Sequence, residues 1–227
     1  MDKYFADIAA ACPYGFEERA VYHQGVFGAI EDKLMAHFLA TGYRRNGNCM
    51  YTMHCPTCSR CIPIRVNPQT FKPNRNQRRV LKKNSDVWAG VAPLAMNREN
   101  LNVLDRFLDT RFPGGKSDGV GYYSGFFLTS MTQCFEIRYR LGEQLLGVAI
   151  IDCGDSWVNA VYFYFDPQFE QRSPGTLNIL SLIDFSCRNG FEYLYLGYWI
   201  EGLRGMSYKS AFRPHELLLG DRWQLVA

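Results

Sequence analysis

The fold is indicated most clearly by residues 134–165, CFEIRYRLGEQLLGVAIIDCGDSWVNAVYFYF. Apolar runs in this stretch alternate with Gly- or Asp-containing turns, which is typical of antiparallel strands that follow one another in a meander. The stretch predicts three strands, at residues 134–141, 145–152 and 157–165.

The residues that follow extend this pattern to a fold class. They predict a loop, an apolar helix ended by Asn189-Gly190, one buried strand and a hairpin around Gly220-Asp221. This order is expected of an N-acyltransferase (GNAT)-like core. We therefore expect an α+β protein with a mixed, largely antiparallel sheet and flanking helices. The predicted ranges are 166–174 (loop), 176–188 (helix), 193–196 (strand), and 216–219 with 223–226 (hairpin).

The first part of the chain predicts shorter elements. We place a boundary near residue 95, between a smaller basic, cysteine-containing region (1–95) and the GNAT-like domain (96–227). No run of about 18 apolar residues predicts a membrane span. The N-terminal residues lack the basic start of a signal peptide, so we expect a cytoplasmic protein. Helices are predicted at 31–40, 73–84 and 99–112, and strands at 49–53 and 62–66.

Positive charge is concentrated in one segment. The 53 residues from Lys33 to Ser85 contain eleven Lys or Arg and no Asp or Glu, although the whole chain carries only +3. The remaining 174 residues carry about −8, because they hold 14 basic and 22 acidic residues. A basic surface favours a polyanion, and nucleic acid is the commonest one. A well-solvated surface is the alternative.

The predicted helix at 73–84 gathers part of this charge on one face, because its basic residues recur at helical spacing. A stripe of like charges is tolerated best when a polyanion lies across it. We interpret this helix as a tRNA-binding element. The predicted tRNA-binding residues are Arg75, Arg78, Arg79, Lys82 and Lys83.

Three cysteines, Cys55, Cys58 and Cys61, have the spacing of thiolate ligands for zinc or an iron–sulfur cluster. Cys12 is the favoured fourth ligand, with His54 and Cys49 as alternatives. The alternative is that these cysteines are reduced thiols that pack in a loop and bind no metal. Cys134, Cys153 and Cys187 lie in apolar contexts and are expected in the core.

Two motifs late in the chain suggest an anion site. The segments 195–201 and 206–216 combine aromatic residues with Lys209 and Arg213, which are expected to bind an anion; Arg44 and Arg45 are the second choice. The loop at 171–176 stands where acetyltransferases bind pyrophosphate. It holds one glycine, Gly175, and Pro174 removes an amide donor, so coenzyme A is not expected.

Together these motifs resemble the bacterial aminoacyl-tRNA–protein transferases of the arginyltransferase family, in the aspartate/glutamate leucyltransferase subgroup. The resemblance implies transfer of leucine from leucyl-tRNA to proteins with N-terminal Asp or Glu, marking them for degradation by the N-degron route. One departure concerns the Cys-x-x-Cys near the N-terminus of eukaryotic members, which is linked to iron–sulfur binding. Here Gly15 stands three residues after Cys12, in the place of the second cysteine, so the motif is halved. The resemblance rests on 42–47, the cysteine run with Pro63 and Arg65, 76–79, 193–200, and Met206, Tyr208, Lys209 and 212–214.

The reaction that the resemblance implies is aminolysis of an activated ester, for which no cofactor is required. Tyr198 and Tyr208 are candidates for an oxyanion donor or proton relay, and Glu201 or Asp166 for acceptance of the amine proton. Arginine rather than leucine as the donated residue is one alternative. A small-molecule N-acetyltransferase and a non-enzymatic nucleic-acid module built on zinc are the others.

Overall fold

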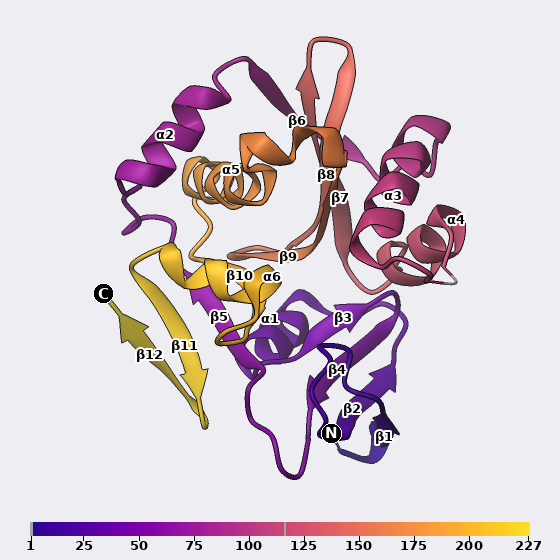
Figure 1. The fold of residues 1–227 in the computed structure, drawn as a ribbon. Coiled ribbons are helices and arrows are strands. Elements are labelled where there is room, and N and C mark those ends of the chain that lie inside the picture. Colours follow the sequence, from indigo (N-terminus) through magenta and orange to yellow (C-terminus); the bar gives the residue numbers. More distant parts are fainter. Residues whose placement is uncertain (1, 116) are drawn as a thin grey trace.

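The computed structural model describes residues 2–115 and 117–227, whose strands form two sheets (Figure 1). The smaller sheet is antiparallel, with strand order β1-β2-β4-β3. Helix α1 follows its second strand and packs Met35, Phe38 and Leu39 into the core. The elements of this part are β1 (Ala6–Ala10), β2 (Ala20–Val26), α1 (Asp32–Ala40), β3 (Arg44–Asn46) and β4 (Cys49–Met53).

The larger sheet has eight strands in the order β12-β11-β5-β10-β9-β8-β7-β6. Only β10 and β9 are parallel, and α5 makes the crossover between them. The strands are β5 (Ile62–Val66), β6 (Val87–Pro93), β7 (Gln133–Leu141), β8 (Gln144–Cys153), β9 (Trp157–Phe165), β10 (Tyr193–Trp199), β11 (His215–Leu219) and β12 (Arg222–Val226). The helices are α2 (Arg75–Lys83), α3 (Arg98–Arg111), α4 (Gly119–Tyr122), α5 (Pro174–Arg188) and α6 (Arg204–Ser207), with the short helices η1 (Asp2–Tyr4), η2 (Tyr123–Phe127), η3 (Pro167–Arg172) and η4 (Tyr208–Ala211).

Helices cover both faces of the large sheet, which explains why β8 is apolar almost throughout. Leu146 and Ile151 lie in the core cluster that includes α5, whereas Val148 and Ile150 lie in the cluster beneath α3. Figure 1 shows α5 and α2 on one side of the sheet and α3 and α4 on the other. None of the helices described in residues 2–115 and 117–227 combines the length and apolar character needed to cross a membrane.

The predicted α+β fold is confirmed, since the strand meander, crossover helix, buried strand and terminal hairpin occur in the predicted order. Strands β1, β2, β3 and β6 were not predicted. The boundary predicted near residue 95 does not separate the sheets, because β5 and β6 belong to the large sheet. The predicted loop 166–174 contains η3, and α5 begins at Pro174.

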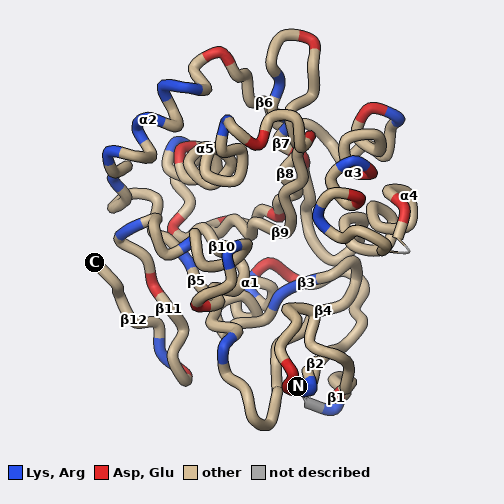
Figure 2. Tube along the Cα trace, viewed as in Figure 1, with Lys and Arg blue, Asp and Glu red and all other residues tan. Residues whose placement is uncertain are grey.

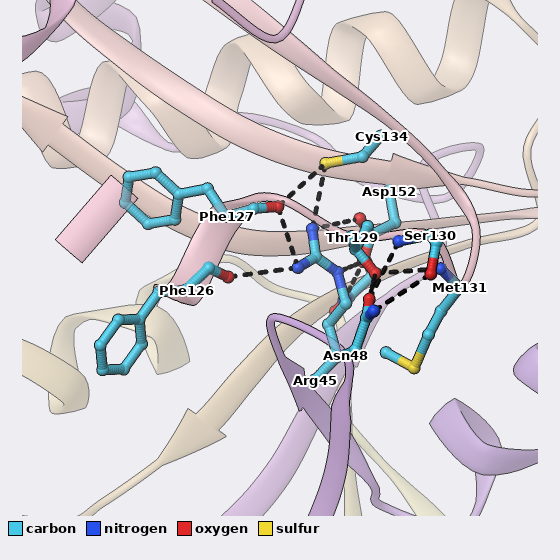
Figure 3. Close-up of polar contacts among 10 residues, drawn as sticks. Arg45, Asn48, Phe126, Phe127, Thr129, Ser130, Met131, Cys134 and Asp152 are labelled. Carbon is cyan, nitrogen blue, oxygen red and sulfur yellow. Dashed lines mark hydrogen bonds and ion pairs between the residues drawn. The ribbon is translucent and has the colours of Figure 1, made fainter. Parts of the chain in front are cut away.

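A buried ion pair joins the two sheets. Arg45 on β3 bonds both carboxylate oxygens of Asp152 on β8, at 2.7 Å each, and both side chains are fully buried. Its remaining guanidinium nitrogen donates to the main-chain oxygens of Phe126 and Phe127 (Figure 3). Arg45 thus has an internal carboxylate partner, and the prediction that it binds substrate is corrected to a structural role.

The turn between β3 and β4 is held at a second point. The Asn48 side chain accepts hydrogen bonds from the Ser130 amide and the Thr129 hydroxyl, both at 2.9 Å (Figure 3). Gly47 has φ +56° and donates its amide to the Phe126 carbonyl at 2.9 Å. The β3–β4 hairpin is therefore fixed on the large sheet, and this fixes the place of Arg44.

Candidate functional site

A bulge in β10 brings two cations together. The pairing of β10 with β5 shifts register between Tyr195 and Tyr198. Gly197 lies inside the shift with φ +84°, a backbone region that favours glycine. Arg44 Nη2 donates to the Gly197 carbonyl at 2.8 Å, and Lys209 Nζ donates to the Tyr198 carbonyl at 2.8 Å. Two successive carbonyl groups of the bulge thus hold Arg44 and Lys209 beside each other.

Gly197 lies close to both cations. A Cβ atom at this position would lie 3.5 Å from Lys209 Nζ and 4.0 Å from Arg44 Nε. The predicted strand ends at residue 196, so Gly197 was not identified as a bulge. A glycine inside a strand pattern typically indicates a bulge or a close approach, and that signal was present.

Neither cation has an acidic partner among residues 2–115 and 117–227, where the structure places no carboxylate oxygen within 4.0 Å of them. Arg44 is buried, and its Nε has no hydrogen-bond partner. Burial lowers the pKa of Arg44. Burial, with Arg44 as a second cause, lowers the pKa of Lys209 from 10.5 to about 7. Two desolvated like charges without a counter-ion favour binding of an anion.

Tyrosine rings form the wall around Arg44. Its guanidinium carbon lies 5.8 Å from the Tyr195 ring centroid and 5.5 Å from that of Tyr198. Burial raises the pKa of Tyr198 to about 12 and raises those of Tyr14 and Tyr51 as well. These phenols stay neutral near pH 7, so they desolvate the cation without cancelling its charge. Tyr14 and Tyr51 were not singled out from the sequence.

The two tyrosines predicted to be catalytic lie in different surroundings. The Tyr198 hydroxyl is buried and donates to the Gly42 carbonyl at 3.3 Å, which favours a structural role. Tyr208 is 36% exposed, and its hydroxyl lies 3.7 Å from where a Cβ of Gly175 would stand, at the beginning of α5. Tyr208 is therefore the more exposed of the two residues.

The two predicted proton acceptors also differ. Asp166 is buried, its carboxylate pairs with Arg106 at 2.6 Å, and it accepts the Gln168 amide at the start of η3. It is therefore not a free base, and that alternative is corrected. Glu201 lies exposed in the turn after β10, without an ion pair to any described residue.

Arg213 does not join the Arg44–Lys209 pair. Its guanidinium is exposed and donates to the main-chain oxygens of Ala227, at 2.7 Å, and Ser210, at 3.4 Å. Although Lys209 and Arg213 are four residues apart, the chain between them forms η4 followed by an extended turn rather than one helix. The prediction that both face one anion is corrected for Arg213 and stays a prediction for Lys209.

Helix α2 presents its basic residues to solvent. A capping box of Asn74 and Gln77 begins the helix, and Gln77 Nε2 also donates to the Ala211 carbonyl at 3.0 Å. This bond ties α2 to η4, the turn that carries Lys209. Figure 2 shows the basic residues in succession along α2. The exposed residues are Arg75, Arg78, Arg79, Lys82 and Lys83.

The predicted cysteine ligands are neighbours but do not form a closed site. Burial, with the nearby Cys55, Cys58 and Cys12 as further causes, raises the pKa of Cys61 to about 12. Thiolates on one zinc ion lie about 3.8 Å apart, since each is about 2.3 Å from the metal. Among residues 2–115 and 117–227, no three of these sulfur atoms lie within 4.8 Å of one another. As placed, the thiols do not fit a zinc ion, and a cluster here stays a prediction.

Of the other cysteines, Cys134 lies against the ion pair between the sheets, 3.0 Å from Arg45 Nη2. Cys153 packs at the core of the large sheet. The prediction that Cys187 is a core residue is wrong, because Cys187 is exposed near the end of α5.

Comparisons with known proteins agree along nearly the whole chain. Residues 10–79 match the family model described as arginine-tRNA-protein transferase, N terminus, and residues 99–219 match the model of its C terminus. An aspartate/glutamate leucyltransferase from Pseudomonas putida is 34% identical over 227 residues, covering 97% of this chain and 95% of that protein. One from Thiobacillus denitrificans is 38% identical over 199 residues, covering 87% and 83%.

A solved structure is similar in fold. The C-terminal domain of a lysylphosphatidylglycerol synthetase from Agrobacterium fabrum has a TM-score of 0.51 at 14% identity, covering 89% of this chain and 66% of that one. At this identity the likeness supports the fold alone. The identity to the curated relatives and the two family models support more: this chain belongs to the arginine-tRNA-protein transferase family.

Proposed function

We propose that this protein transfers leucine from leucyl-tRNA to the N-terminal Asp or Glu of acceptor proteins. Relatives named aspartate/glutamate leucyltransferase support the reaction. The observation that carries the proposal is the Arg44–Lys209 pair, two adjacent desolvated cations with no internal counter-ion. A site for an acidic acceptor residue requires such a pair.

The acceptor side chain binds between these two cations. Arg44 Nε is an unused donor, and Lys209 has N–H groups beyond the one it gives to Tyr198. A carboxylate can satisfy both, and hydrogen bonds between charged groups contribute about 1.5–3 kcal/mol each. An Asn or Ala side chain has no charge to offer, so the pair also disfavours the wrong acceptors. Specificity for Asp and Glu follows.

The chemistry itself is aminolysis. The α-amine nitrogen of the acceptor attacks the leucyl carbonyl carbon, a C–N bond forms, and the C–O bond to the ribose breaks. The amine loses a proton and the ribose oxygen gains one, so the overall reaction needs no other reactant. An α-amine with an ordinary pKa of about 7.7–8.0 is largely protonated at pH 7. The protein contributes mainly by holding the two ends together.

The Tyr208 hydroxyl is our candidate for the hydrogen bond that stabilises the oxyanion. Burial raises its pKa to about 12, so it keeps the proton that it would donate. It stands at the beginning of α5, where the helix dipole favours negative charge. The 3′ end of the tRNA would bind here, at the edge of the acceptor site.

Helix α2 would bind the tRNA backbone. Its five exposed basic residues extend away from η4, and Gln77 anchors the helix to that turn. A tRNA lying on α2 thus has a direct route to Lys209. Contacts to phosphate would position the tRNA without reading its sequence.

The test is a transfer assay with two donors and four acceptors. Purified protein is given leucyl-tRNA or arginyl-tRNA and peptides that begin with Asp, Glu, Asn or Ala. Transfer of leucine to the Asp and Glu peptides alone is expected. Transfer of arginine would identify arginyl-tRNA as the donor in place of leucyl-tRNA. Transfer from neither tRNA would refute the enzymatic function. Arg44→Gln should lose Asp and Glu acceptance, whereas Arg213→Ala, the matched control outside the pair, should retain it.

A further inference from the structure

Three potential metal ligands meet on one face of the small sheet, away from the cysteines. Asp7 on β1 is directly opposite His23 on β2. His23 is opposite Thr52 on β4, and the His54 amide bonds the Val21 carbonyl. Residues two apart on a strand share a face, so His54 lies diagonally beside His23. Strand register alone therefore brings an acid and two histidines together.

The side chains converge on a single carboxylate oxygen. Asp7 Oδ1 lies 2.7 Å from His23 Nδ1 and 3.6 Å from His54 Nδ1. The two imidazole rings stack with centroids 4.3 Å apart and planes 19° apart. Phe5 stacks on the other side of His23, at 5.0 Å and 11°. The ligand atoms of the three residues lie within 4.8 Å of one another.

A hydrogen bond from His23 to Asp7 explains only the shorter contact. At 3.6 Å the His54 nitrogen is too far from the carboxylate oxygen for a good hydrogen bond. It is near the separation of about 3.3 Å that two nitrogen or oxygen ligands have on one tetrahedral ion. The Asp7–His23 pair would need to open by about 0.6 Å to reach the same spacing, and the exposed His54 ring would need to turn out of its stack on His23 so that both ring nitrogens face one ion.

We propose that Asp7, His23 and His54 bind a divalent transition-metal ion of the zinc class. Two imidazoles and one carboxylate are a donor set that suits zinc and its neighbours and is poorly suited to Mg²⁺ or Ca²⁺, which prefer oxygen alone. The Asp7 and His54 side chains are 57% and 49% exposed. Solvent therefore reaches the site, and water completes the coordination.

This site is separate from the cysteine cluster. The cysteine that follows His54, Cys55, accepts a hydrogen bond through its sulfur from the Val21 amide at 3.5 Å. His54, which the sequence suggested as a fourth ligand for the cysteines, faces Asp7 and His23 instead. The two candidate sites thus use different residues and different donor atoms.

A metal ion at this site would stabilise the pairing of β1 with β2. All five residues of β1 are exposed, and β1 pairs with β2 alone at the edge of the sheet. An ion on Asp7, His23 and His54 links β1 to β2 and to the end of β4. A ligand that binds only the folded arrangement stabilises it, so metal should slow local opening of β1.

The experiment uses the full chain after treatment with a chelator, with Zn²⁺ and Co²⁺ as probes. Calorimetry measures Zn²⁺ affinity for wild type, Asp7→Asn and His54→Ala, two surface changes that should not disturb folding. Loss of a residue that only hydrogen-bonds to a metal ligand lowers metal affinity about 10–100-fold. Each of these substitutions removes a direct ligand, so Zn²⁺ affinity should fall by about two orders of magnitude. His37→Ala, which changes an exposed histidine on α1, should bind as wild type does.

Two further measurements make the result decisive. Bound Co²⁺ should show ligand-field absorption without a sulfur-to-cobalt charge-transfer band, and Zn²⁺ should slow hydrogen exchange at the β1 amides in wild type but not in His54→Ala. Equal Zn²⁺ affinity in wild type, Asp7→Asn and His54→Ala would overturn the proposal. A thiolate spectrum that survives both substitutions would also overturn it, because the metal would then be on the cysteines.

Discussion

Replacing Lys209 by Met removes one of the two cations beside Gly197 while keeping an apolar side chain of similar length. In the free protein Lys209 faces a second cation, Arg44, and no carboxylate among the described residues. Removing its charge should therefore leave the melting temperature unchanged or raise it. Transfer to an acidic acceptor should decrease, because the acceptor carboxylate loses a charged partner.

The size of the effect follows from the lost contact. One hydrogen bond between charged groups contributes about 1.5–3 kcal/mol, which corresponds to about 10–150-fold in kcat/KM. This loss should appear with a peptide that begins with Asp. With a peptide that begins with Asn, the lysine has no charge to bind, so the substitution should change kcat/KM by less than about threefold.

The pH profile provides a second measure. Because the pKa of Lys209 in the free protein is about 7, kcat/KM for the Asp peptide should fall as pH rises above 7 and should lose this descending limb in Lys209→Met. The unfolded chain binds this proton up to the ordinary pKa of 10.5. Wild-type stability should therefore rise between pH 7 and 10.5, and Lys209→Met should lack that rise.

The assay is steady-state transfer from leucyl-tRNA to the two peptides between pH 6 and 9, with thermal melting on the same samples. An equal loss for the Asp and Asn peptides would refute the assignment of Lys209 to the acceptor carboxylate. A large fall in melting temperature would refute the electrostatic argument, because the lysine would then stabilise the fold.

Three further outcomes are expected. Arg78→Glu should weaken tRNA binding and reduce the slope of log K against log salt by about 1 in filter-binding assays, whereas Arg188→Glu, an exposed arginine on α5, should not. Asp152→Ala should destabilise the protein by about 3–5 kcal/mol in chemical denaturation, since it leaves Arg45 buried and unpaired; a change below 1 kcal/mol would contradict this. Gly197→Ala should lose most activity through strain at φ +84° and crowding of Lys209, and full activity would contradict the role of the bulge.

The large sheet could be predicted because its signals are local. The apolar runs that form β7, β8 and β9 are long and separated by clear turns, and α5 has a strong apolar pattern with a Gly stop. Strand β6 escaped prediction because its sequence, VWAGVAP, contains Gly and Pro and is weakly strand-like. In the small sheet β4 was predicted, whereas the edge strands β1 and β3 escaped because β1 is fully exposed and β3 has three residues.

The site could be predicted in part. Arg44 and the basic face of α2 follow from a segment without acidic residues, and Lys209 follows from a cation placed among aromatic residues. The sequence could not distinguish Arg44 from Arg45, because that needs β3 to be known as a strand whose successive side chains point to opposite sides. It also could not show that Arg213 reaches the carbonyl of Ala227, since helical spacing was assumed where the chain turns.

The adjacency of Arg44 and Arg45 has one more consequence. Arg44, which we propose to bind the acceptor carboxylate, is followed by Arg45, which pairs with Asp152 and so holds the β3–β4 hairpin on the large sheet. If the small sheet separates from the large sheet, Arg44 is therefore displaced from the acceptor site before the rest of the protein unfolds. During partial unfolding, selectivity for acidic N-termini should therefore be lost first, while most of the helix and strand content is still present.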